Sequence, residues 1–231
     1  DYPALRQMHA ASCLVADEET RPWRGVCTKT ETETKTVPLE TSLERSVPLD
    51  EDIIKRGSTR HFARTAISFA ELSTILDHST RGIPADFLEG AETSLLDLYL
   101  IVNDVEGLDP GSYYFSPTQK RLELLQGGSM RHEAGYLCLE QALAADASAV
   151  VFFLSDLNRA LERFGNRGYR AAQLEAGIIG GKLYLTAYSL GLGASGLTFY
   201  DDDVVKFFSP HAEGKDAIFV VALGKAGRLK G

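Results

Sequence analysis

The densest group of polar side chains in the sequence lies between residues 55 and 62. Arg56 and Arg60 stand four positions apart, with Gly57 and Ser58 between them. Two guanidinium groups supply bidentate donors, the glycine lets the backbone approach closely, and the serine adds a hydroxyl. A phosphate monoester requires these groups, so the segment is a candidate anion site. A solvated basic loop after a helix C-terminus would have the same composition, and the spacing leaves both interpretations open.

A second candidate is the glycine-rich segment Gly191-Leu-Gly193-Ala-Ser-Gly196, which follows a long helical stretch. It looks like the glycine loop of a dinucleotide-binding fold, but that loop must follow a strand, so this interpretation fails. A turn that ends the helix remains open. So does a loop whose backbone N–H and C=O groups lie flat against a planar ligand.

The other polar residues are weaker candidates. The histidines are scattered, and no pair has metal-ligand spacing beside a carboxylate, so we predict no metal site. The acidic run 201–203 is expected to cap a helix at its positive end. No nucleophile-elbow, zinc-protease or phosphate-loop motif occurs.

Composition limits the partners of the chain. Its 231 residues carry 24 basic and 32 acidic side chains, which gives a net charge of −8. Nucleic acids and anionic membranes bind clustered positive charge, so we expect neither as a partner. No apolar run reaches the roughly 18 residues of a membrane span, and the N-terminus lacks a signal-peptide pattern. Three cysteines without CxxC spacing predict a soluble protein of a reducing compartment, the cytoplasm.

Two regions differ along the chain. Residues 1–48 contain several prolines and a stretch from Thr28 to Thr36 of alternating Thr, Lys and Glu, which indicates an N-terminal extension or linker. Residues 49–231 mix helical and strand patterns with a central hairpin. We therefore predict one α+β sandwich domain built around one sheet.

Local signals place the elements of this domain. Asp50 is expected to cap a short helix that Gly57 ends, and Ser68 with Glu71 forms a capping box that opens the next helix. Apolar runs predict buried strands, and apolar residues at helical spacing predict further helices. The expected strands are 95–102, 113–115, 121–125, 149–154 and 217–223, and the expected later helices are 132–144, 169–190 and 201–208.

The longest helical stretch, residues 169–190, contains Gly177, Gly180 and Gly181. An interior glycine costs about 1 kcal/mol relative to alanine. Three of them within five residues imply that another helix or a partner subunit approaches this helix very closely.

Several motifs follow one another in a specific order. They are Arg56-Gly-Ser-Thr-Arg60-His-Phe62, Ser68 to Leu76, Val105-Glu-Gly-Leu-Asp-Pro-Gly-Ser-Tyr113, Arg167-Gly-Tyr-Arg170, Leu174-Glu-Ala-Gly177, and Leu190-Gly-Leu-Gly-Ala194 with Asp201-Asp-Asp203 after it. Together they resemble the FMN-dependent nitroreductase superfamily, and within it the SagB/ThcOx-type branch, which includes azoline dehydrogenases. The resemblance covers roughly residues 49–231, and the segments 10–12 and 23–24 resemble the N-terminal extension of that branch.

The resemblance implies a nitroreductase-like, FMN-binding sandwich with a central, mainly antiparallel sheet flanked by helices. It also implies a homodimer with FMN at the interface. Arg56, Gly57 and Ser58 would contact the FMN phosphate and ribityl chain. Arg60 would be the catalytic residue, lying by the pyrimidine edge, where a guanidinium stabilises the negative charge of reduced flavin. The other implied cofactor-binding positions are Ala194, Ser195, Gly196, Lys225 and Arg228.

The implied activity is that of an oxidoreductase. Hydride reaches flavin N5 and leaves to, or comes from, a small-molecule or peptide substrate in the same pocket, with NAD(P)H as a candidate electron donor. In this chemistry the protein seats and tunes the flavin and excludes water, while the flavin carries the electrons.

Two positions depart from the pattern of the branch. Glu89 replaces a serine that contacts flavin, and Arg163-Phe164 occupies the place of a Lys-Tyr pair used in azoline oxidation. Phenylalanine has no proton to exchange. These departures favour one alternative, a catalytically degenerate flavin-binding or scaffold domain in a biosynthetic complex. A module that binds another phosphate-bearing molecule through the same arginines also stays open. Other candidate proton carriers, which the sequence alone does not place in a pocket, are Tyr169, Tyr184, Tyr188 and Tyr200.

Overall fold

Seven strands in the described part of the chain form one sheet, in which every neighbouring pair is antiparallel. The computed structural model describes residues 2–16, 18–19, 35–41, 43, 47–85, 87–88 and 94–227. The strand order is β1-β6-β5-β3-β7-β9-β8. These strands are β1 (Thr36–Pro38), β3 (Leu96–Val102), β5 (Gly111–Ser116), β6 (Arg121–Gly127), β7 (Ala149–Ser155), β8 (Gly193–Gly196) and β9 (Asp216–Gly224). Two short strands, β2 (Ile67–Ser68) and β4 (Val105–Glu106), pair in parallel beside the sheet.

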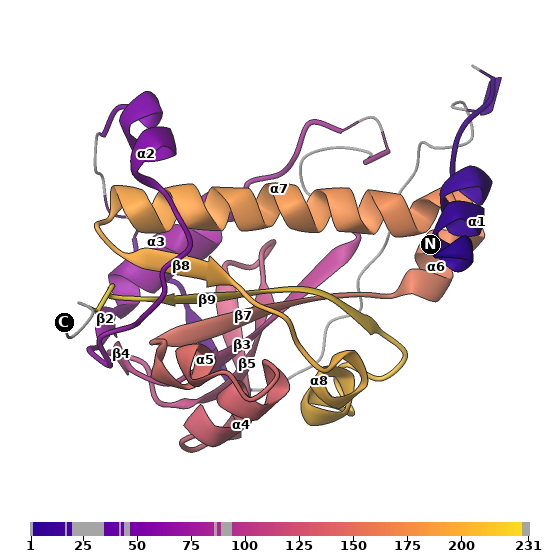
Figure 1. Cartoon of the computed structure of the whole chain (residues 1–231). Helices are drawn as coiled ribbons and strands as arrows, with labels where there is room; N and C mark the ends of the chain where they lie inside the picture. The colour runs from indigo at the N-terminus through magenta and orange to yellow at the C-terminus, as the bar shows by residue number, and fades with distance from the viewer. Residues whose placement is uncertain are drawn as a thin grey trace.

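Helices cover both faces of the sheet (Figure 1). The long helix α7 runs across one face together with α3, and α4, α5 and α8 lie on the other. The helices of the described residues are α1 (Pro3–Ala11), α2 (Leu49–Lys55), α3 (Phe69–Ser79), α4 (Arg131–Leu137), α5 (Ala142–Asp146), α6 (Leu157–Phe164), α7 (Arg167–Ser189) and α8 (Asp201–Phe208).

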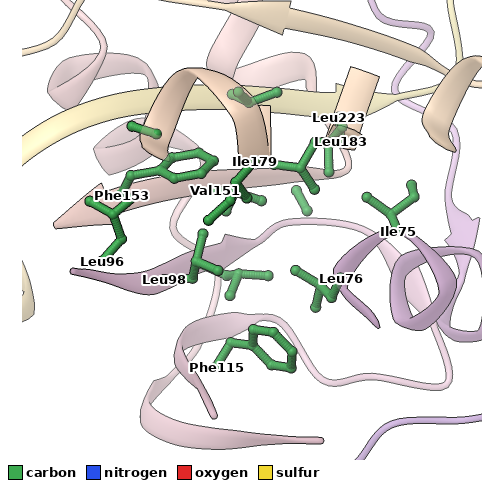
Figure 2. Close-up of a cluster of buried hydrophobic side chains, with 14 of the residues drawn as sticks. Ile75, Leu76, Leu96, Leu98, Phe115, Val151, Phe153, Ile179, Leu183 and Leu223 are labelled. Atoms are coloured by element: carbon green, nitrogen blue, oxygen red, sulfur yellow. The ribbon is translucent and has the colours of Figure 1, made fainter. Parts of the chain in front are cut away.

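Each face of the sheet has its own hydrophobic core, because successive strand side chains point to opposite faces. Leu96, Leu98 and Leu100 of β3 pack toward α3 and α7, while Tyr99 and Ile101 pack toward α4 and α8. Figure 2 shows the first core, in which side chains of α3 and α7 meet those of the central strands. The α+β sandwich expected from the sequence is therefore confirmed, including the capping box of Ser68 and Glu71 at the start of α3.

The segment before residue 49 touches the sandwich at three described places. β1 pairs with β6 and forms one edge of the sheet. The amides of Glu40 and Leu43 donate to Ser73 Oγ and Thr74 Oγ1 of α3 at 3.1 and 2.8 Å. The end of α1 is held by Arg170 of α7, whose Nε donates to Ser12 Oγ at 2.6 Å and whose Nη2 lies 2.7 Å from His9 Nδ1. Trp23 and most of the stretch from Thr28 to Thr36 lie outside the described residues.

Three local expectations were wrong. The helix expected over 132–144 is divided into α4 and α5, because Leu139 and Glu140 adopt positive φ angles of 56° and 58°. Asp50 does not cap α2, which starts after Pro48. Gly57 does not end α2 either, since the extended conformation of Arg56 already stops the helix.

The glycine-rich segment after α7 also differs from expectation. Gly191, with φ of 77°, makes the expected helix-ending turn, in which the amides of Gly191 and Leu192 donate to the carbonyls of Tyr188 and Ala187. Residues 193–196 are not a loop, however. They form β8, which pairs with the last strand β9.

Candidate functional site

The candidate site forms where the segment after α2 crosses the ends of β8 and β9. We call residues 56–63 the arginine loop. The amide of Thr59 donates to the carbonyl of Ala194 at 2.9 Å, and the amide of Ala63 donates to the carbonyl of Lys225 at 2.9 Å. The amide of Gly227 donates back to the carbonyl of His61 at 2.8 Å. The bond between Thr59 and Ala194 joins the two candidate segments of the sequence analysis at one edge of the sheet.

All but one of the binding positions expected from the sequence lie at this edge. Arg56, Gly57, Ser58 and Arg60 are exposed on the arginine loop, and Lys225 is exposed after β9. Ala194 and Ser195 are buried within β8 and present no free side-chain surface, and the Ala194 carbonyl already accepts from the Thr59 amide. Arg228 lies outside the described residues, as does Glu89.

The electrostatics of the arginine loop favour an anion. Within the described residues, none of Arg56, Arg60 and Lys225 forms an ion pair. The neighbouring Lys55 differs, because its ammonium contacts Glu51 at 2.8 Å and this hydrogen bond raises the pKa of Lys55. In a chain of net charge −8, a group of cations without acidic partners is an arrangement that an anionic ligand would complete.

Thr59 fixes the arginine loop against β8. Its side chain is buried, and its Oγ1 has no hydrogen-bond partner among the described residues. A Cβ atom at Gly193 would lie inside van der Waals contact of that Oγ1, so only glycine fits opposite Thr59. The structure thus combines a close approach of two backbones with a buried hydroxyl that lacks a partner.

Gly193→Ala is therefore expected to displace the arginine loop and to lower the free energy of unfolding by about 1–3 kcal/mol, the usual cost of overpacking. Urea unfolding of the purified protein measures this loss. Gly127→Ala is the matched control, because a Cβ at Gly127 meets nothing within 4 Å. Equal stability of the two variants would contradict the tight contact between β8 and Thr59.

Two tyrosines of α7 complete the candidate site. The Tyr188 hydroxyl donates to the carbonyl of Gly57 at 3.0 Å, and the Tyr184 hydroxyl accepts from the amide of Gly196 and lies 3.5 Å from Ser58 Oγ. The sequence named both tyrosines as proton carriers without placing them. Their spacing of four residues, which puts them on one side of α7 just before the turn at Gly191, was the available signal. Tyr169 lies in the first turn of α7, and the ring of Tyr200 packs at a tilt against Tyr136 of α4.

Arg163 and Phe164 lie elsewhere in the chain. They end α6, which leads into the start of α7, whereas β8 follows its end (Figure 1). A helix of 23 residues spans about 34 Å. Phe164 is 5% exposed and belongs to the core between α7 and the sheet. Within one chain this pair therefore does not reach the arginine loop.

A second polar cluster lies on the face of the sheet that α4, α5 and α8 cover. Lys215 Nζ donates to Asp97 Oδ2 and to the Tyr99 hydroxyl, both at 2.8 Å, and that hydroxyl lies 2.9 Å from His211 Nδ1. Burial raises the pKa of Tyr99, and burial together with the Lys215 charge lowers the pKa of His211. Tyr99 thus stays protonated and His211 neutral, which suits a network that holds the segment between α8 and β9 on the sheet.

Comparison with protein families and curated proteins gives one consistent result. The family profile described as the nitroreductase family matches residues 53–225. A candidate nitroreductase of Methanocaldococcus jannaschii is 30% identical over 164 residues, which are 68% of this chain and 82% of that protein.

Solved structures show the same fold. A candidate nitroreductase from Anabaena variabilis has a TM-score of 0.73 and 29% identity over 84% of this chain, which spans only 42% of that protein. One from Ralstonia eutropha has a TM-score of 0.68 and 21% identity, covering 89% of this chain and 94% of that one. A chain of the Escherichia coli microcin synthetase McbBCD complex, solved with a truncated precursor peptide, has a TM-score of 0.64 and 15% identity, covering 97% and 92%. In the described residues, no helix is long and apolar enough to cross a membrane.

Proposed function

Because the chain belongs to the nitroreductase family, we propose that it is an FMN-dependent oxidoreductase whose flavin site is the junction of the arginine loop and β8. The observation that carries the proposal is the pairing of Thr59 with Ala194 and of Ala63 with Lys225. It gathers at one place hydroxyl groups, a glycine-dependent backbone contact and cations that have no acidic partner among the described residues. Flavin-dependent oxidation and reduction is the common activity of the family.

The residues present fit FMN. Its phosphate is a dianion, and Arg56, Ser58 and Lys225 offer charged and neutral donors without a competing acid in the described part of the loop. By the resemblance of its motif, Arg60 would face the pyrimidine end and stabilise the reduced, anionic form. Bound FMN supplies two-electron transfer through its N5 atom. Arg228, by the same resemblance, is proposed to add a further cation near the phosphate.

A test of this proposal is the visible absorption of the purified full chain, alone and after incubation with FMN. A flavin spectrum that is retained through gel filtration and bleached by NADH or NADPH supports an FMN oxidoreductase with a nicotinamide donor. Bleaching by dithionite alone supports the flavin site and excludes that donor. A chain that retains no flavin would refute the proposal and leave the module for another phosphate-bearing ligand.

We also propose a homodimer with the flavin at its interface. Leu174 is 55% exposed on the outer side of α7, where Gly177 and Gly181 are exposed too, and Ile54 of the neighbouring α2 is 82% exposed. A second copy that covers this side would bury these apolar groups. Light scattering of the purified chain tests the dimer.

Residues 1–48 are proposed as an extension to this domain. A reducing location is also proposed, and the free thiols of Cys13 and Cys138 agree with it.

A second candidate function is a flavin-binding scaffold within a biosynthetic complex that modifies peptides, as in the SagB/ThcOx-type branch. Phe164 favours it, because the place of a proton-carrying tyrosine is taken by a core phenylalanine. The fold likeness to a chain of the microcin synthetase complex agrees with this candidate. A holoprotein whose flavin reduces no added acceptor would favour the scaffold over the enzyme.

The chain alone is expected to be a weak azoline dehydrogenase. Removal of two hydrogens from an azoline ring needs a base for the ring proton, and such a base typically contributes 10²–10⁴-fold. A guanidinium such as that of Arg163 has donors but no acceptor, and Phe164 has no proton to exchange. Oxidation of a thiazoline peptide should therefore be about 10²–10⁴-fold slower than it would be with a positioned base, or absent. Turnover is expected with acceptors that need little proton transfer, such as quinones or nitroaromatics. Efficient thiazole formation by the purified chain would contradict this prediction.

A further inference from the structure

The Tyr184 hydroxyl lies between the two segments of the proposed flavin site. The amide of Gly196 in β8 donates to the Tyr184 oxygen, and Ser58 Oγ of the arginine loop lies 3.5 Å from the same oxygen. One phenol on α7 thus reaches two segments that are separated by more than 130 residues. The Gly196 amide, in turn, is engaged by the phenol and not free to bind a ligand itself.

The hydrogen bonds of this phenol leave its proton without a close acceptor among the described residues. A phenol oxygen accepts hydrogen bonds and donates one proton. Gly196 N–H takes an acceptor position, so the proton can go only to a different group. Among the described residues, the acceptor within reach is Ser58 Oγ, and 3.5 Å is well beyond the usual 2.7–2.8 Å of an O–H···O bond. A hydroxyl that accepts one hydrogen bond also becomes a better donor through polarisation.

Tyr188, one turn later on the same helix, is engaged differently. Its hydroxyl donates to the Gly57 carbonyl at 3.0 Å, which is an ordinary hydrogen bond within the protein. Tyr188 therefore holds the arginine loop in place, and its proton has a partner. Only Tyr184 of this pair combines an accepted backbone bond with a proton that lacks a close acceptor.

We propose that Tyr184 is a flavin-binding residue that acts as a hydrogen-bond relay. Its oxygen accepts from the Gly196 amide, and its hydroxyl donates to an acceptor atom of the FMN ring. This inference rests on the proposed function. Flavin rings carry carbonyl oxygens and ring nitrogens that accept hydrogen bonds. The chain therefore supplies at this point a side-chain donor, where the sequence alone indicated a backbone contact.

The experiment compares the full chain with its Tyr184→Phe and Tyr188→Phe variants. FMN is titrated into each apoprotein, its binding is followed by quenching of flavin fluorescence, and the visible spectrum of the saturated protein is recorded. Tyr184→Phe is expected to raise the Kd for FMN about 2- to 10-fold and to shift the spectrum of the bound flavin. Tyr188→Phe is expected to leave the spectrum of the bound flavin as in the wild type, whatever its Kd. Tyr136→Phe, on α4 across the sheet, is the control for loss of an exposed tyrosine hydroxyl.

The outcomes separate the inference from the function on which it rests. If the wild type does not bind FMN, the proposed function fails. If it binds FMN and Tyr184→Phe shows the wild-type Kd and spectrum, or if both α7 variants weaken binding without a spectral change, the relay is refuted and the flavin site stands. If Tyr184→Phe does not fold, 3-fluorotyrosine at position 184 replaces it. Its more acidic phenol should bind FMN more tightly, and unchanged affinity would overturn the inference.

Discussion

Arg56→Ala is expected to deplete the protein of FMN, raising the Kd about 10- to 100-fold. A hydrogen bond to a charged group contributes about 1.5–3 kcal/mol, and each 1.4 kcal/mol is tenfold in affinity. Arg56 opens the arginine loop and has no acidic partner among the described residues, so its guanidinium is free for the phosphate. Flavin content after purification and fluorescence titration of the apoprotein both measure the loss.

Arg60→Ala should fail in a different way. A guanidinium near the pyrimidine end stabilises the anionic reduced flavin more than the neutral oxidised form, so its removal lowers the reduction potential. More FMN should remain bound than in Arg56→Ala. The potential is measured by equilibration with a dye of known potential during slow reduction.

Lys55→Ala provides the matched control for both arginine variants. It removes one positive charge next to Arg56, but this charge is already paired with Glu51. FMN affinity and potential should therefore match those of the wild type. The assignment of the arginine loop is wrong if Arg56→Ala and Arg60→Ala behave like the wild type, or if Lys55→Ala loses as much flavin as they do.

The elements that the sequence predicted correctly are those whose signals are local. The capping box at Ser68 and the apolar runs that became β3, β7 and β9 depend on neighbouring residues, and the structure retains them. The break between α4 and α5 had no such signal, because Leu139 and Glu140 are ordinary helix formers held at positive φ. β8 was missed for the opposite reason. Gly-Ala-Ser-Gly has little strand propensity, and pairing with β9 alone makes it a strand.

In the candidate site, too, the residues with local signals were predicted and those defined by non-local contacts were not. Arg56, Ser58 and Arg60 could be selected from the sequence, because the side chains that an anion site requires lie within a few positions of one another. The part played by Tyr184 could not, since its hydroxyl meets Ser58 across 126 positions of the chain and Gly196 across the turn at Gly191. The contact of Thr59 with Gly193 is likewise non-local, and only the folded chain shows why that glycine is required.

Gly180→Leu is expected to destabilise the fold by about 1–3 kcal/mol and to weaken FMN binding with it. A Cβ at Gly180 would lie 2.6 Å from Cε1 of Phe219 in β9. The close approach predicted from the glycines of α7 is therefore real at this position, but its partner is a strand of the same chain and not another helix or subunit. Phe219 also lies 3.2 Å from where a Cβ of Gly196 would stand, so pushing its ring disturbs β8.

The other two glycines of the stretch 177–181 provide the comparison that interprets this result. A Cβ at Gly177 or Gly181 meets nothing within 4 Å in the chain, so the predicted close contact is wrong for them within one subunit. Gly177→Ala and Gly181→Ala should be neutral or gain up to about 1 kcal/mol from helix propensity. Gly177→Leu then reports on the partner. If the outer side of α7 is the dimer interface, light scattering of this variant should give the mass of a monomer. The free energy of unfolding of its subunit should equal that of the wild-type subunit. A dimer unaffected by Gly177→Leu would place the interface elsewhere, and a stable Gly180→Leu would refute the packing of α7 on Phe219.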